Sequence, residues 1–388
     1  MAKLLKIREL NLDIPKEAKR LAEMMLTDLE KSKRPVLEAV KTSLDNSFYN
    51  AKVGYLTPGD KMVRTELNVS SVQKLARVLF MLELLLKNLE TGAINTKREL
   101  YYMCKGVIKK GNSRLRPLDF EDQTESDSII DFIGDMLRVY REELNCFAND
   151  RGGQTYSQQL VVTETMPDGD KATIDLSSLG TAPYQPKNRP QALKLRARKK
   201  IDFCLIVESE GTANTLQGMG FTKRNNCILM GAQGVPSNAV RGWAKLIEEE
   251  LSVPMYFFGD LDAYTLQNIF RTLKAGSAAS LIRNADFSAP QVRFLGVLPE
   301  DVKKYDLNTY RVKESDPVEA RALKKAKDAL ENDPFFLDKK NKGLADILRW
   351  LIKEKVRCEQ QSFFSVDPDD PIKTEKIILE KIKSGSYI

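Results

Sequence analysis

Four short apolar runs alternate with amphipathic segments in the C-terminal half of the chain, and this alternation constrains the fold most strongly. The runs are IDFCLIV, NCILMGA, PMYFFG and QVRFLGV, and a helical pattern follows each of the first three. Strands that alternate with helices pair in parallel, because each crossover helix returns the chain to the same edge of the sheet. The sequence therefore predicts an α/β domain over residues 201–388, with a parallel, doubly wound sheet and additional C-terminal helices.

Composition excludes several kinds of chemistry. The chain of 388 residues has no histidine, and its five cysteines are scattered singly. A Ser or Cys nucleophile activated by histidine and a zinc site with histidine ligands are therefore excluded. Catalysis would have to use carboxylates, Lys, Arg, Tyr, Ser or Cys, which makes oxygen-ligated Mg²⁺ the natural metal candidate.

The apolar runs and the chain's N-terminal segment bear on localisation. No run approaches the roughly 18 apolar residues that a membrane-spanning helix needs. The N-terminal segment is charged throughout and lacks the apolar stretch of a secretory signal. We therefore expect a cytoplasmic protein that makes no membrane contact. Its net charge of +7 favours an anionic partner weakly.

Three helices are predicted in the N-terminal half. The segment from Val69 to Gly92 is apolar nearly all round and ends at a glycine, as a buried helix would. A second helix begins at Thr96, where Thr96 and Glu99 have the spacing of a capping box. A third follows from Ser126. Three such helices joined by a short turn indicate a helix-turn-helix or winged-helix unit.

The remaining segments complete a division into four parts. The segment QQLVVTETMPDGDKATIDL has β-rich flanks around Asp-Gly, which predicts a hairpin that could form a wing. Residues 187–200 carry seven Lys or Arg and no acid, a pattern that fits a solvated surface or a nucleic-acid contact. The parts are a helical N-terminal extension (1–68) with its helix at 16–41, a winged-helix domain (69–180), a basic linker (181–200) and the α/β domain (201–388).

Acidic residues follow two of the apolar runs. Glu208 follows the first run, and Asp260 and Asp262 follow the third. Neighbouring strands would bring three carboxylates to one sheet edge, where they repel one another unless a cation neutralises them. Mg²⁺ at such an edge typically polarises a phosphate. Each acid alone could instead cap a helix or bind a ribose. An aspartyl-phosphate site of the haloacid-dehalogenase type is disfavoured, because Tyr264 occupies the motif's fifth position.

Two adjacent tyrosines occupy different faces of the second predicted helix. Tyr101 lies about 90° and Tyr102 about 170° from the middle of the apolar face. Tyr101 should therefore lie at the edge of the core, and Tyr102 should point outward. Arg98 lies four positions before Tyr102 and shares its face, so both side chains could contact one phosphodiester.

These motifs together resemble a known family, the A subunit of DNA topoisomerase VI and its relative, the meiotic double-strand-break transesterase. The similar segments are TKRELYY, VESE, GDLDAY with KAGS, and APQVRFLGVLPEDVKKYDL, in the same order between about Val69 and Asp306. The resemblance implies a CAP-like winged-helix domain and a Toprim domain with a Rossmann-like sheet that holds Mg²⁺. It identifies the expected site residues: the nucleophile Tyr102, its supporting Arg98, and the metal ligands Glu208, Asp260 and Asp262.

The resemblance also implies an activity and partners. The chain would be the A subunit of an ATP-dependent type IIB topoisomerase that cuts double-stranded DNA through a 5′-phosphotyrosyl link. Passage of a second duplex would then relax and decatenate DNA in the nucleoid. Two A subunits would form a homodimer in which the tyrosine of one protomer meets the Toprim metal of the other. Since the sequence contains no P-loop motif, ATP hydrolysis would come from a GHKL-type ATPase B subunit in an A₂B₂ complex, docked in part by the N-terminal region.

The chain departs from the family pattern at three positions. Ser209 replaces the lysine that commonly follows the Toprim glutamate, and Ala263 and Thr265 replace the Pro and Gly of D-x-D-P-Y-G. These departures motivate one alternative, a catalytically inactive DNA-binding relative. Retention of all five expected catalytic residues argues against it. A dedicated break-forming transesterase is a further alternative, although the closeness of the Toprim motifs favours the topoisomerase.

Overall fold

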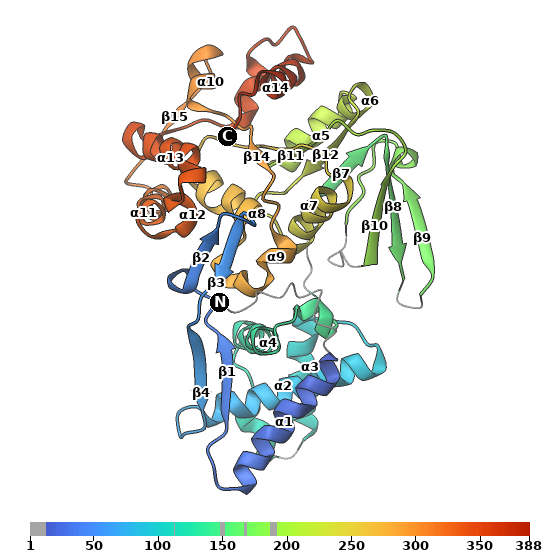
Figure 1. The fold of residues 1–388 in the computed structure, drawn as a ribbon, viewed down its shortest axis with the longest axis vertical. Helices are drawn as coiled ribbons and strands as arrows, with labels where there is room; N and C mark the ends of the chain where they lie inside the picture. The colour runs from blue at the N-terminus through green and yellow to red at the C-terminus, as the bar shows by residue number, and fades with distance from the viewer. Residues whose placement is uncertain (1–12, 112, 148–151, 167–168, 187–191) are drawn as a thin grey trace. The chain divides into compact units, whose positions relative to one another are not determined.

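The chain divides into two compact units in a computed structural model that describes residues 13–111, 113–147, 152–166, 169–186 and 192–388 (Figure 1). The first unit contains the described residues of Met1–Asn46 and Pro58–Asn149, and the second contains those of Ser47–Thr57 and Asp150–Ile388. The backbone therefore crosses between the units three times. None of the described helices is long and apolar enough to cross a membrane.

The described residues of the first unit form four α-helices and one antiparallel strand pair. These elements are α1 (Ile14–Glu30), β1 (Val36–Val40), β4 (Met62–Glu66), α2 (Val72–Thr91), α3 (Lys97–Lys110) and α4 (Gln123–Leu137). Helices α2, α3 and α4 pack around fully buried side chains such as Leu85, Leu100 and Ile130. The short strands β5 (Asn95–Thr96) and β6 (Cys146–Phe147) pair in parallel beside them.

Local signals at the helix ends are confirmed. Helix α2 ends at Gly92, whose φ of 68° is the left-handed conformation that glycine adopts without strain. At the start of α3, the Glu99 N–H donates to the Thr96 hydroxyl at 3.1 Å, and the Thr96 N–H donates to the Glu99 carboxylate at 2.6 Å. This is the predicted capping box, which satisfies two backbone donors at once.

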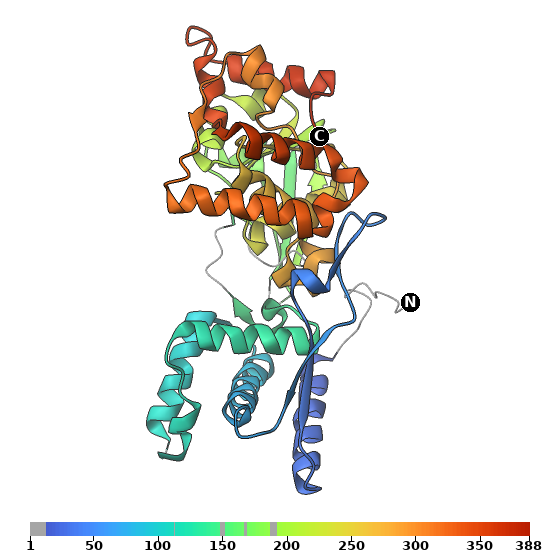
Figure 2. The same cartoon turned by 90° about the vertical axis from the view of Figure 1, so that its left-hand side faces the viewer.

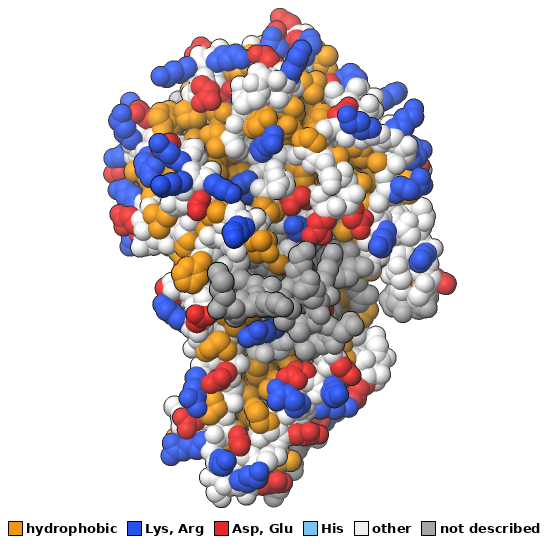
Figure 3. Space-filling model, viewed as in Figure 1, with side chains coloured by type: hydrophobic (Ala, Val, Ile, Leu, Met, Phe, Trp, Pro, Cys, Tyr) orange, Lys and Arg blue, Asp and Glu red, His pale blue; other side chains and the backbone are white. Residues whose placement is uncertain are grey.

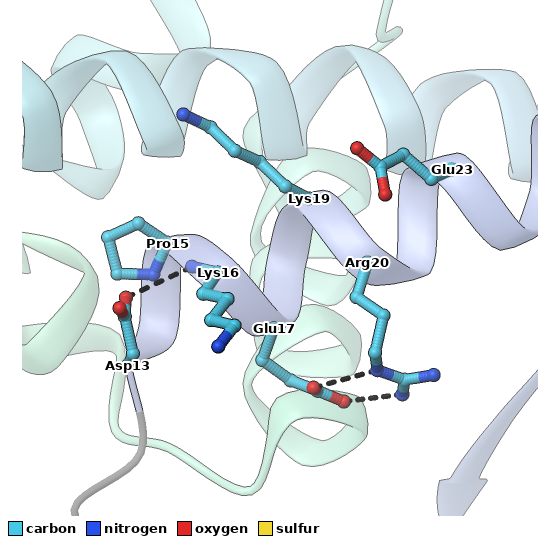
Figure 4. Close-up of a pocket in the computed structure, with 7 residues that line it drawn as sticks. All are labelled: Asp13, Pro15, Lys16, Glu17, Lys19, Arg20 and Glu23. Carbon is cyan, nitrogen blue, oxygen red and sulfur yellow. Dashed lines mark hydrogen bonds and ion pairs between the residues drawn. The ribbon is translucent and has the colours of Figure 1, made fainter.

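The expected helix over 16–41 is wrong at its C-terminal end. Helix α1 stops at Glu30, and Ser32 has a φ of 53°, which is outside the helical region. Pro35 then cannot continue a helix, and Val36–Val40 pairs as strand β1 with β4. At the other end, Asp13 caps α1 by accepting a 3.1 Å bond from the Lys16 N–H (Figure 4). The N-terminal extension is therefore only partly helical.

A hairpin from this N-terminal region belongs to the second unit. Strands β2 (Ser47–Asn50) and β3 (Tyr55–Pro58) form it. The Tyr49 ring lies edge-on to Phe335 with centroids 5.5 Å apart, and the Leu56 carbonyl accepts a 3.1 Å bond from Asn284. No local pattern predicts this docking, because neither partner is near in the chain.

The second unit is centred on a five-stranded sheet. In spatial order its strands are β14 (Arg293–Phe294), β13 (Met255–Phe258), β11 (Phe203–Val207), β12 (Cys227–Gly231) and β7 (Gln154–Ser157). The pairs β14–β13, β13–β11 and β11–β12 are parallel, and β7 pairs antiparallel with β12. This confirms the predicted α/β domain with a parallel sheet. Strand β7 was not predicted, since the segment QTYS is too polar and too short to stand out.

Helices surround this sheet in the chain order that the sequence predicts. They are α5 (Glu210–Gly218), α6 (Phe221–Arg224), α7 (Asn238–Leu251), a π-helical turn (Thr265–Phe270) leading into α8 (Arg271–Ala275), α9 (Asn284–Phe287) and α10 (Pro299–Lys304). The C-terminal helices follow, and α11 packs against α12 and α13 (Figure 2). These helices are α11 (Pro317–Asn332), α12 (Pro334–Leu337), α13 (Lys342–Glu354) and α14 (Lys373–Ser384). The short strands β15 (Tyr310–Arg311) and β16 (Val356–Arg357) pair beside them.

The predicted hairpin is present, but it is not part of the three-helix unit. Its strands β8 (Leu160–Thr165) and β9 (Lys171–Asp175) join β10 (Leu193–Ala197) in a three-stranded antiparallel sheet within the second unit. The expectation that this hairpin forms the wing is therefore not supported; the antiparallel pair of the first unit is β1–β4. Part of the expected linker over 181–200 is strand β10, while residues 187–191 lie outside the described residues.

Candidate active site

The three predicted metal ligands lie at the carboxyl edge of the parallel sheet. Strands β11 and β13 are neighbours, so Glu208 after one and Asp260 and Asp262 after the other reach the same edge. The backbone N–H of Asp260 donates to a Glu208 carboxylate oxygen at 3.1 Å. The topology thus brings together acids that are 52 positions apart in the chain.

Burial raises the pKa of all three carboxyl groups, and repulsion by neighbouring acids adds to it at Glu208 and Asp260. Burial, together with the charge of Asp260, raises the pKa of Glu208 to about 8. Burial raises the pKa of Asp260 to about 6, and it also raises the pKa of Asp262. Carboxyl groups in such a buried acidic edge favour the protonated form unless a nearby positive charge stabilises the ionised form. The all-oxygen set therefore suits a hard cation such as Mg²⁺.

The acids are held by protein donors rather than arranged around a closed ion site. In the part of the chain that the structure describes, no three His, Cys, Asp or Glu side chains are grouped as a metal site. The Thr265 hydroxyl lies 3.1 and 3.0 Å from the two Glu208 oxygens, and its N–H donates to Asp262 at 2.6 Å. The Gln360 N–H donates to Asp260 at 2.8 Å. Sequence reasoning missed Gln360, which no motif marks, and noted Thr265 only as a departure.

A C-terminal segment fixes the loop that carries the two aspartates. Leu261 and Cys358 form an antiparallel bridge, with N–H···O distances of 2.9 and 3.1 Å in the two directions. Both side chains are fully buried. Because Leu261 stands between Asp260 and Asp262, this bridge fixes the backbone of both acids.

Ser209 has a structural role at the position where the family pattern has lysine. Its hydroxyl accepts a 3.4 Å bond from the Thr212 N–H and caps helix α5. Serine is among the best N-cap residues, and the flexible lysine side chain cannot accept this bond. The departure therefore has a local physical cause that leaves Glu208 in place.

The two tyrosines of α3 have the predicted orientations. Tyr102 is 56% exposed, whereas Tyr101 packs against the buried core of the first unit. The Arg98 guanidinium lies 5.9 Å from the centre of the Tyr102 ring, and the Lys105 ammonium lies 5.1 Å from that of Tyr101. Tyr102 thus presents its ring and hydroxyl to solvent beside a cation. The catalytic roles of Tyr102 and Arg98 remain predictions, as do the metal roles of the acids.

Of two hollows in the described surface, one is lined by a predicted site residue and the other is not. A cavity of about 600 Å³ in the second unit is lined by Asp262, Tyr264, Arg357 and both apolar and charged side chains of α11. A more open hollow of about 720 Å³ on α1 is lined by charged side chains, including the Glu17–Arg20 ion pair, and contains no predicted site residue (Figure 4). On the face drawn in Figure 3, basic and acidic side chains are interspersed, so the net positive charge is not gathered there.

Two family models match the chain. The model described as the Toprim domain of the topoisomerase 6 A subunit and Spo11 matches residues 203–382, which include the four parallel strands of the sheet and all three acids but not strand β7. The model described as type IIB DNA topoisomerase matches residues 73–146, which include helices α2, α3 and α4. The predicted Toprim domain is therefore confirmed, whereas the second model does not itself establish a winged helix.

Whole-chain relatives agree with both models. The chain is 33% identical to the A subunit of type 2 DNA topoisomerase 6 from Methanocaldococcus jannaschii, over 94% of this chain and 93% of that protein. It is 28% identical to the protein of the same name from Pyrococcus abyssi, over 96% and 94%. It is 27% identical to that of Aeropyrum pernix, over 94% and 92%. The similarity thus extends through both compact units.

Proposed function

The chain belongs to the family of topoisomerase 6 A subunits and is a DNA topoisomerase of type IIB, and from this premise we propose that Tyr102 cuts the DNA backbone. The observation that carries the proposal is the exposure of Tyr102 beside Arg98 on a capped, well-packed helix. Tyr101, its neighbour, is held against the core and serves as packing.

The cleavage step is a transesterification. The Tyr102 oxygen attacks a backbone phosphorus as its proton leaves, a phosphotyrosyl bond to the 5′ side forms, and the bond from phosphorus to the 3′ oxygen breaks. The 3′ oxygen departs and takes up a proton. Arg98 stabilises the extra negative charge on the phosphate through its planar guanidinium. Because one ester replaces another, attack by the 3′ hydroxyl reverses the step and reseals the strand.

Glu208, Asp260 and Asp262 would hold Mg²⁺. The raised pKa values of Glu208 and Asp260 support this, since burial disfavours their charged forms, the neighbouring carboxylates add repulsion, and a bound cation would compensate both effects. When bound, Mg²⁺ would supply positive charge that orients and polarises the phosphate. The acids would fix its position, and the donors from Thr265 and Gln360 would keep the acids in place.

The assembly follows from the chemistry. One chain offers one such tyrosine, whereas a double-strand break needs two, so a symmetric homodimer on double-stranded DNA is proposed. In it, Tyr102 of one protomer would act with the acidic edge of the other. A GHKL-type ATPase B subunit would complete an A₂B₂ enzyme that passes one duplex through another, in the cytoplasm at the nucleoid. The relatives' designation as a subunit supports a second component.

The test uses the chain with its ATPase partner, ATP, Mg²⁺ and supercoiled DNA, followed by denaturation. Wild-type protein and Tyr101→Phe should give protein-linked 5′ ends, and Tyr102→Phe should give none. Relaxation that requires the ATPase would separate a topoisomerase from a dedicated break-forming transesterase. Adducts that persist in Tyr102→Phe, or none with the wild type, would refute the assignment and favour the inactive DNA-binding relative.

A further inference from the structure

We propose that Thr265 and Gln360 are positioning residues that fix Glu208 and Asp260 for a divalent cation before it arrives. The inference rests on the proposed metal-binding function of the acidic edge and assigns two further residues to it. Neither residue follows the family pattern on which the metal ligands were predicted: Thr265 stands where that pattern has glycine, and Gln360 lies outside every matched motif.

Thr265 joins the acids that follow two different strands. Its side chain is fully buried, and its hydroxyl lies within hydrogen-bond distance of both Glu208 oxygens. Its backbone N–H donates to Asp262. A glycine could supply the backbone bond but not the bond to Glu208. Thr265 also begins a π-helical turn, a geometry that is rare and frequent at functional sites.

Gln360 holds the third carboxylate from a distant part of the chain. It is 1% exposed, its backbone N–H donates to Asp260 at 2.8 Å, and its side-chain amide acts to lower the pKa of the same carboxyl group. Its side-chain oxygen is buried and has no hydrogen-bond partner among the described residues. A buried acceptor without a partner is unfavourable, so this oxygen is available to accept a bond from a cation-bound water. The bridge between Leu261 and Cys358 holds this segment against the aspartate loop.

These contacts counter a specific electrostatic problem. Three neighbouring carboxylates repel one another and would turn apart in the absence of a cation. Donors to each acid stabilise the charged form and fix its rotamer, which reduces the free energy needed to assemble the site on binding. Partners that orient metal ligands typically change metal affinity by about 10–100-fold when they are removed.

The experiment measures cation binding without DNA and without turnover. The full chain is titrated with Mn²⁺, which shares the oxygen preference of Mg²⁺, and free Mn²⁺ is followed by electron paramagnetic resonance. Thr265→Val removes the hydroxyl at constant shape and should weaken binding at least about 10-fold, while Thr265→Ser should restore it. Gln360→Met keeps the backbone bond and should also weaken binding. Thr212→Val is the matched control, because its buried hydroxyl has no partner in the described part of the chain.

The outcomes separate this inference from the proposed function. Asp260→Ala should abolish Mn²⁺ binding; if it does not, or if the wild type binds no Mn²⁺, the metal site itself is refuted. If Asp260→Ala loses binding but Thr265→Val and Gln360→Met bind as the wild type does, only the positioning role is refuted. A lowered melting temperature in metal-free Thr265→Val, with unchanged affinity, would likewise show a purely structural role.

Discussion

A buried ion pair between the C-terminal helix and the rest of the second unit gives a sharp prediction. Lys381 on α14 pairs with Asp301 on α10, and their side chains are 2% and 4% exposed. The Asp301 carboxylate also accepts a 2.8 Å bond from the Leu298 N–H. Burial is the largest influence on both groups: it raises the pKa of Asp301 and lowers that of Lys381, although each charge favours the other. Lys381→Met should therefore leave the buried Asp301 carboxylate without a cationic partner.

The expected loss of stability follows from the protonation that this carboxylate can undergo. Removing one partner of a buried pair costs about 3–5 kcal/mol. Protonation sets a limit: keeping this carboxyl group neutral in the folded state at pH 7 costs about 1.36 × (7 − 3.9), or about 4 kcal/mol. The penalty arises because the unfolded chain releases the carboxyl proton at a lower pH than the folded variant does. At a pH below the unfolded pKa both states hold the proton and the penalty disappears, so the stability deficit of Lys381→Met should shrink as pH falls from 7 toward 4.

Urea unfolding of the full chain measures this loss. Both tryptophans, Trp243 and Trp350, lie in the second unit, so their fluorescence reports the unit that contains the pair. Lys376→Met is the matched control, because Lys376 lies on the same helix and forms an exposed pair with Asp370. Exposed pairs contribute little, so this variant should unfold as the wild type does. Equal stability of both variants, or a deficit that grows at low pH, would refute the reasoning.

Two further predictions concern other parts of the fold. Thr96→Ala removes the capping box of α3 and should destabilise the first unit by about 1 kcal/mol. Hydrogen exchange of the α3 amides measures this loss. Thr91→Ala is the control, because the Thr91 hydroxyl donates to the Lys87 carbonyl within its own helix. Burial lowers the pKa of Lys274 to about 8, and its ammonium donates to the Pro290 and Val292 carbonyls at 2.7 Å. Because the unfolded state keeps that proton up to about pH 10.4, stability from this group should rise by about 2 kcal/mol between pH 8 and 9.5. Urea unfolding of wild type and Lys274→Met should show this difference, and a pH-independent gap would contradict it.

The sequence predicted those features that local patterns encode. Apolar runs of strand length located β11, β12 and β13, and the acids directly after them located the edge where Glu208 and Asp260 meet. Helical periodicity placed Tyr102 outward and Tyr101 toward the core. Each of these inferences needed only the period of an element and the rule that parallel strands end at one edge.

Features that depend on long-range pairing escaped prediction. Strand β7 is polar and becomes a strand only because β12 offers an open edge. The segment VLEAV of strand β1 is compatible with both helical and strand periodicity, and only its pairing with β4 makes it a strand. The bond from Gln360 to Asp260 spans 100 positions, and no local periodicity marks such a contact.

The contacts of Ser209 and Thr265, two departures from the family pattern, support the proposal that the acidic edge still binds a metal. Loss of activity would relax the constraint on the acidic edge, and polar replacements there would have no reason to meet the acids. Yet the Thr265 hydroxyl contacts both oxygens of Glu208, and the Ser209 hydroxyl caps the helix that follows that same residue. Thr265 thus adds a bond to an acid, and Ser209 adds a helix cap directly after it. This pattern is expected if the edge is maintained by selection for binding, and it is hard to reconcile with an inactive remnant.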